Sequence, residues 1–302
     1  MDRADTPALP PVPLDRLPRR VRPVVERALQ HWLGRFVLGC MATSRRIELF
    51  DRSMTIAAQI FTSVLPILIA LASWFGRDSA DVIARTASVP PETQGLLDEV
   101  LASPEETTTF GVIGVLVVLV SATSLSRALT RACAALWELP RPTSRLTAAW
   151  RWVAVVLALA LSLVAARQLH SFSDRLPPPG FWDTVVGFAT DVAIALFVPM
   201  VLLAGAVPVR RLLPWGVAFA AVMVVVRPVS TVYLPHALDA SAERYGSIGV
   251  AFTYLAWLYV VSFIFLASGV VGKVVAMDEG RFGAWIRGES PPRAESAGGP
   301  DR

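Results

Sequence analysis

The apolar positions of this chain form long blocks that contain almost no charge. A helix needs about 20 mostly apolar residues to cross a hydrocarbon core of about 30 Å, whereas a transmembrane β-barrel shows segments of about ten alternating residues. The pattern therefore predicts an all-α membrane protein, a bundle of six transmembrane helices. The six blocks lie at about residues 55–75, 110–126, 150–166, 184–206, 212–233 and 248–272.

The segments outside these blocks predict the rest of the organisation. Residues 1–30 are rich in Pro and Arg and lack periodicity, which predicts a disordered tail, and residues 278–302 predict a second one. Residues 31–277 form the membrane domain. From Trp32 to Phe50, apolar and Arg positions alternate at helical spacing, which predicts an N-terminal amphipathic helix in the membrane interface.

The longest external loop, residues 76–109, is acidic and is divided by Pro90 and Pro91. It predicts a short helical external cap on the membrane domain. We favour a solvated cap over a cation-attracting vestibule, although rings of acidic residues do line some cation pathways.

Composition excludes the soluble and disordered classes. Hydrophobic residues make up 54% of the chain and charged residues 17%, against roughly 25% charged in an average soluble domain. The net charge of +4 is interpreted as setting orientation in the membrane, not as a site for nucleic acid. Two cysteines, Cys40 and Cys133, are too few for a disulfide framework or a metal site.

The distribution of basic residues predicts the topology. With six spans, 22 basic residues fall on the side of the two termini and five on the other, with Arg227 inside a span. Cytoplasmic loops of membrane proteins carry the excess of Lys and Arg. Both termini are therefore expected in the cytoplasm.

Two charged residues lie inside predicted spans, Asp191 in the fourth and Arg227 in the fifth. Insertion scales give a cost of about 2.5–3.5 kcal/mol for a charge at the bilayer centre, so such residues usually have a function or a partner. Counted from the external ends, both lie about 10 Å deep at 1.5 Å per residue. We expect an ion pair in a polar cleft. The alternatives are that each residue snorkels to the interface, or that the pair only fastens two helices.

Other polar and helix-breaking positions extend this candidate cleft. Gln59 and Ser63 lie four residues apart, on one face of the first span. They either line a substrate path or bond to a neighbouring helix. Pro66 and Pro228 are candidate helix breaks. At the entrance to the last span, Gly246 provides a tight turn beside the interfacial anchor Tyr245.

Nothing in the sequence supports an enzyme. The three histidines are His31, His170 and His236, and they fall in a tail and in external loops. The sequence shows no metalloprotease motif, phosphate-binding glycine loop or Ser/His/Asp set. No catalytic residue, metal or cofactor is expected.

Several segments together resemble one family. They are Tyr245-Gly246-Ser247-Ile248-Gly249 with Trp257-Leu258-Tyr259 and Gly269, Ala57 with Ser63-Val64-Leu65-Pro66, Ser121-Ala122 with Trp137 and Arg141, and Pro208 with Leu213-Pro214-Trp215-Gly216. In order and spacing they resemble the YihY/BrkB family of virulence factor BrkB-like bacterial inner-membrane proteins, formerly mislabelled ribonuclease BN. The resemblance covers residues 47–277.

The chain departs from that pattern at three places. Ala58-Gln59 replaces a Tyr pair, Ala134 replaces an Asn, and Gly269-Val270-Val271 lacks the acidic residue that follows in relatives. An ion-coupling role of that acid is therefore not available here.

The resemblance implies a six-span protein of the bacterial inner membrane with both termini in the cytoplasm. We expect a transporter or permease of a small solute or lipid. The alternative is a non-transporting, envelope-organising protein. The expected partners are membrane lipids and an unidentified solute, and the sequence does not define the oligomeric state.

Overall fold

The protein is described by a computed structural model that covers residues 31–75, 107–140, 181–278 and 281–288. Within these ranges the chain is helical and has no strand. The helices are α2 (Trp32–Arg46), α3 (Leu49–Phe75), α6 (Thr107–Leu136), α8 (Phe181–Leu202), α9 (Val209–Ala276) and α10 (Arg281–Arg287).

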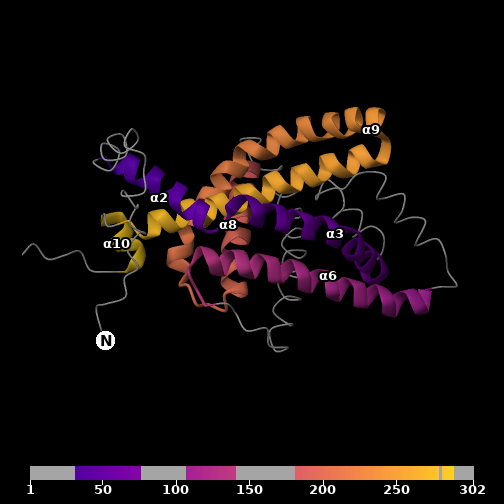
Figure 1. Cartoon of the computed structure of the whole chain (residues 1–302), viewed down its shortest axis with the longest axis horizontal. Coiled ribbons are helices and arrows are strands. Elements are labelled where there is room, and N and C mark those ends of the chain that lie inside the picture. Colours follow the sequence, from indigo (N-terminus) through magenta and orange to yellow (C-terminus); the bar gives the residue numbers. More distant parts are fainter. Residues whose placement is uncertain (1–30, 76–106, 141–180, 279–280, 289–302) are drawn as a thin grey trace, which may run out of the picture.

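Helix α9 is a hairpin. Its backbone leaves helical geometry at Gly246, where φ is +62° and ψ is −149°. Glycine adopts this conformation without a steric penalty, and the chain therefore reverses there. Figure 1 shows the two arms of α9 lying side by side and extending in the same direction as α3 and α6. The hydroxyls of Ser241 and Thr253 hydrogen bond across the arms at 2.7 Å.

The packing centres on the base of this hairpin, where α9 contacts α3 and α8. The Trp215 side chain is fully buried, and its indole Nε1 donates to the carbonyl oxygen of Phe265 at 2.9 Å. Gly269 and Gly272 on the return arm face it. Small residues let helix backbones approach closely in membrane proteins. Here Gly269 leaves room for the indole ring of Trp215, and Gly272 leaves room for the Trp215 backbone.

Helices occupy five of the six predicted spans. Residues 55–75 lie in α3, residues 110–126 in α6, most of 184–206 in α8, and both 212–233 and 248–272 in α9. The third predicted span, the N-terminal tail and nearly all of the predicted external cap lie outside the described residues. Among the described residues, Thr184–Leu202 in α8 and the whole of α9 are long and apolar enough to cross a membrane.

Two predictions differ from the structure. The connection predicted between the last two spans, residues 234–247, is helical up to Tyr245. Helix α10 occupies residues that were predicted to be disordered. It is held there because the Arg287 guanidinium donates to the carbonyl oxygens of Ala276 and Asp278, at 3.1 and 2.8 Å.

The predicted amphipathic segment is present as α2, followed by an elbow at Ile47 and Glu48 that leads into α3. Leu33, Val37 and Met41 recur every four residues and are exposed. This spacing places them on one face of the helix. The helix therefore keeps an apolar face uncovered by the rest of the described chain.

Candidate functional site

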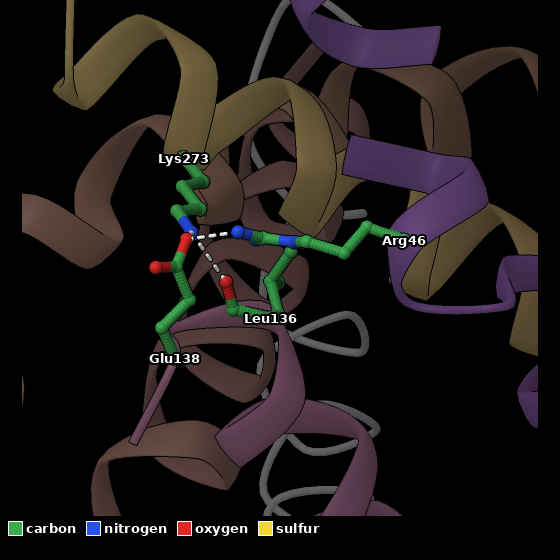
Figure 2. A network of polar contacts seen from close by, with 4 residues as sticks. All are labelled: Arg46, Leu136, Glu138 and Lys273. Atoms are coloured by element: carbon green, nitrogen blue, oxygen red, sulfur yellow. Dashed lines mark hydrogen bonds and ion pairs between the residues drawn. The ribbon is translucent and has the colours of Figure 1, made fainter. Parts of the chain in front are cut away.

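A cluster of three charged side chains joins α2, α6 and α9 at the base of the bundle (Figure 2). The Lys273 ammonium, only 6% exposed, lies 2.7 Å from Oε1 of Glu138. It also donates to the carbonyl oxygen of Leu136 at 2.8 Å. The Arg46 guanidinium pairs with the same Glu138 oxygen. We call Arg46, Glu138 and Lys273 the basal cluster.

Local backbone structure explains why these groups meet. Helix α6 ends at Leu136, and its last carbonyls have no partner inside the helix. The Lys273 ammonium satisfies one of them at the negative end of the helix dipole. Two residues later, Glu138 adopts a φ of +56°, and the amide of Leu139 donates back to the carbonyl oxygen of Ala134 at 2.9 Å. This is the left-handed turn that commonly ends helices and that favours glycine.

Glu138 therefore holds a conformation that glycine would adopt at lower cost, about 1–2 kcal/mol for a residue with a side chain. The ion pair of the Glu138 carboxylate with Lys273 offsets this conformational cost. Among the described residues, Glu138 is the acidic partner that the structure shows for Lys273. The Lys273 hydrogen bond is the main cause that lowers the pKa of Glu138. Partial burial opposes that shift, and the Arg46 hydrogen bond adds to it.

This pKa shift predicts an acid-sensitive contribution to stability. A carboxyl whose folded pKa lies below its ordinary value of 4.5 stabilises the fold fully above that pH, and the contribution is lost as the pH falls through the folded pKa. We expect the difference in Tm between wild type and Glu138→Gln to be constant above pH 4.5 and to shrink below it. Thermal unfolding of both proteins in detergent measures this difference. A gap that is unchanged in acid would contradict the assignment.

Asp191 and Arg227 are brought together, as the depth count predicts. The Arg227 guanidinium donates to Oδ1 of Asp191 across the interface of α8 and α9. The Asp191 side chain is 5% exposed and that of Arg227 is 42% exposed. The carboxylate is therefore enclosed between helices, and the arginine covers it from the outer side.

Gln59 and Ser63 lie elsewhere. Gln59 lines a groove of about 480 Å³ between α3 and α6, which we call the α3–α6 groove. The Ser63 hydroxyl donates to the carbonyl oxygen of Gln59 at 2.6 Å, and lies 3.4 Å from that of Ser121 on α6. Ser63 thus bonds to its own and the neighbouring helix. Among the described lining residues of the groove, neither Asp191 nor Arg227 occurs, so the four residues predicted for one cleft divide between two places.

The structure treats the two candidate helix breaks, Pro66 and Pro228, differently from the candidate turn at Gly246. Helix α3 continues through Pro66, and α9 continues through Pro228, so neither proline ends its helix, and a kink at these positions stays a prediction. The N–H that Pro228 lacks would bond to the carbonyl oxygen of Val224, whereas the Ser230 hydroxyl donates to that of Arg227, at 2.7 Å. The turn at Gly246 is confirmed, and Tyr245 beside it is 71% exposed.

The basal cluster was not predicted from the sequence. The available signal was Lys273, the only lysine among 28 basic residues, placed directly after the last predicted span. Among the described residues, no group of three His, Cys, Asp or Glu side chains is arranged to hold a metal ion. The expectation that the chain needs no metal or cofactor stays a prediction.

Comparison with known proteins places these features in one family. No curated protein and no solved structure matches the chain. The family model described as Virulence factor BrkB matches residues 42–285, a range that contains the basal cluster, the Asp191–Arg227 pair and the α3–α6 groove. Together with the apolar helices α8 and α9, this match indicates an integral membrane protein. The chain belongs to the virulence factor BrkB family.

Proposed function

We propose that this chain is a permease of the bacterial inner membrane that moves a small solute or a lipid. In this proposal six helices span the bilayer, both termini and the basal cluster lie on the cytoplasmic side, and α2 lies in the interface with Leu33, Val37 and Met41 in the lipid. Membrane lipids and the transported molecule are its partners, and it catalyses no chemical reaction.

The observation that carries the proposal is the Asp191–Arg227 pair inside two apolar helices. Charged residues at membrane depth usually face a bundle interior or a water-filled path, and they pair with one another there. Replacing a buried ion pair by apolar residues of similar volume is often neutral or stabilising. If the pair only held α8 against α9, apolar side chains would do so at least as well. A transport path, in contrast, needs charged groups at this position.

A non-transporting, envelope-organising protein is the second candidate, and the position of the groove favours it. A permease should connect its polar groups in one path. The described lining of the α3–α6 groove is separate from the Asp191–Arg227 pair, and the base of the bundle is filled by Trp215 and its neighbours. In this case the ion pair is a fastening of α8 to α9.

Transport in proteoliposomes separates the two candidates. The probes are fluorescent phosphatidylglycerol, whose crossing is followed by dithionite quenching, and trapped phosphate, glutamate and choline, whose efflux is followed directly. We expect wild type to exceed empty vesicles with at least one probe. Asp191→Arg and Arg227→Asp should each reduce that rate roughly tenfold, which corresponds to about 1.4 kcal/mol, and the double exchange should restore part of it.

Arg244→Asp is the matched control, because it changes the charge by the same amount at an exposed position of α9 and should transport like wild type. Size-exclusion profiles show whether each variant is folded. If wild type and empty vesicles behave alike with every probe, the permease proposal fails and the structural candidate stands. Transport that the double exchange does not restore would remove the pair from the transport path.

A further inference from the structure

The two members of the Asp191–Arg227 pair differ in how far a ligand can reach them. The Asp191 side chain is 5% exposed and that of Arg227 is 42% exposed. Their contact joins one guanidinium nitrogen, Nη2, to one carboxylate oxygen, Oδ1. A guanidinium has five N–H donors, and among the described residues the structure shows Asp191 as the partner of this one. An incoming ligand therefore meets a cation that still has unused donors.

The surroundings of the pair are apolar. Val224, Val225 and Val229 lie near Arg227 on α9 and are 39%, 62% and 56% exposed. Both α8 and α9 are apolar enough to cross a membrane, and an uncompensated charge at membrane depth is costly. The ion pair keeps the site neutral overall. A complex with a ligand should meet the same condition.

This condition determines which ligand fits. An anion that binds Arg227 while Asp191 is ionised leaves the site with one excess negative charge. The site stays neutral if the Asp191 carboxylate takes up one proton when the anion binds. The anion then replaces the carboxylate as the partner of the guanidinium, and the neutral carboxyl stays enclosed between α8 and α9. A cation has no equivalent route, because the guanidinium covers the carboxylate.

Among the described residues, Asp191 is the group that can supply this proton uptake. Arg227 is the charged group that acts on it. Helix α8 packs against α9 and α6, and the return arm of α9 has no acidic, basic or histidine residue between Gly246 and Lys273. The other ionisable residues that come next along these helices are Asp183 on α8, Tyr233 and His236 on the first arm of α9, Tyr254 and Tyr259 on its return arm, and Arg127, Arg131 and Cys133 on α6.

From this geometry we infer that the Asp191–Arg227 site transports a monovalent anion together with one proton. Arg227 binds the anionic group, which is a sulfonate, carboxylate or phosphate on a free solute or on a lipid headgroup. Asp191 takes up the proton on the side where the anion enters and releases it where the anion leaves, so the ion pair forms again. This inference rests on the permease proposal and specifies its substrate class and coupling ion.

Anion binding to the purified full chain tests the inference without transport. The probes are methanesulfonate and dihexanoylphosphatidylglycerol, which both keep one negative charge between about pH 5 and 8, and the uncharged analogue dimethyl sulfone. Isothermal titration calorimetry in two buffers of different ionisation enthalpy gives the affinity and the number of protons taken up. For wild type we expect an anion to bind with about one proton, and its affinity to rise about tenfold for each pH unit of acidification. Dimethyl sulfone should not bind.

The two anionic probes distinguish the sources of the ligand. Binding of methanesulfonate identifies a free anion as sufficient, whereas binding of the phosphatidylglycerol alone identifies a lipid headgroup. Either result supports the inference if one proton accompanies the anion.

Variants of the pair separate the two roles. Asp191→Asn imitates the protonated carboxyl, so it should bind the anion without proton uptake, with an affinity that does not change with pH. Arg227→Gln should weaken binding at least about tenfold. Arg244→Gln is the matched control, because it removes the same charge from an exposed position of α9 and should bind like wild type. Size-exclusion profiles show which variants are folded, and the proton count on wild type does not depend on any variant.

Anion binding to wild type without proton uptake would overturn the inference. A pH dependence that persists in Asp191→Asn, or equal binding by wild type and Arg227→Gln, would also overturn it. So would the absence of anion binding by both wild type and Asp191→Asn at every pH. Transport of choline in the proteoliposome experiment would still support a permease in that case, so the two failures are distinct.

Discussion

Replacing Gly272 by alanine is expected to prevent the native packing of α9. A Cβ atom at this position would lie 2.5 Å from the backbone nitrogen of Trp215 and 2.6 Å from its Cα. These are backbone atoms, so a side-chain rotation cannot relieve the clash, and the two arms of the hairpin must separate at their base. Overpacking in a core typically costs about 1–3 kcal/mol. We expect at least about 3 kcal/mol here, with loss of the monodisperse protein in size-exclusion chromatography.

Gly216→Ala is the matched control on the opposite arm. Its added Cβ would meet Cγ of Leu196 at 3.1 Å, and a leucine side chain can yield by a few tenths of an ångström. We expect a loss of about 1 kcal/mol or less and a normal elution profile. Thermal unfolding in detergent compares the two variants with wild type. Similar Tm values for Gly272→Ala and Gly216→Ala would show that the base of the hairpin is less tightly packed than described.

Glu138→Ala should be the most destabilising single change in the basal cluster. It leaves the Lys273 ammonium, 6% exposed, with only the Leu136 carbonyl oxygen as a described partner. Removing one member of a buried pair typically costs about 3–5 kcal/mol. Because Glu138 itself is 44% exposed, we expect about 2–3 kcal/mol, measured as a lower Tm of the purified protein.

Two further variants separate the charge from the backbone. Glu138→Gly removes the same charge but relieves the positive φ, so it should be less destabilising than Glu138→Ala by about 1 kcal/mol. Arg46→Ala leaves Lys273 paired with Glu138 and removes a partner that is 33% exposed, so it should cost less than about 1 kcal/mol. If Arg46→Ala destabilises as strongly as Glu138→Ala, the buried lysine is not the centre of the cluster.

The sequence predicted correctly those features that depend on the helical period or on a residue's distance from the end of a span. The apolar blocks predict helices because every backbone group must be satisfied inside a span. Counting residues from the span ends placed Asp191 and Arg227 at one depth, and the structure pairs them. Gly246 was recognised because a reversal needs a residue that tolerates positive φ.

The same reasoning failed where a contact depends on how helices are placed relative to one another. Gln59 and the Asp191–Arg227 pair were assigned to one cleft, because sequence gives depth but not which helices are neighbours. The structure instead places Gln59 between α3 and α6 and the pair between α8 and α9. The sequence also did not show that α3 and α9 continue through Pro66 and Pro228, because a proline inside a helix can either kink it or end it.

The sequence by itself therefore determined an apolar helical chain, the turn at Gly246 and the alignment of Asp191 with Arg227, since these follow from the period and the rise of a helix. Only the tertiary structure decided that Lys273 meets Glu138 and Arg46, residues 135 and 227 positions away along the chain. It also decided that Gly272 makes room for Trp215. The physical reason is that these contacts depend on the distance and the angle at which two helices cross. The volumes of the side chains on both helices set that distance and angle together.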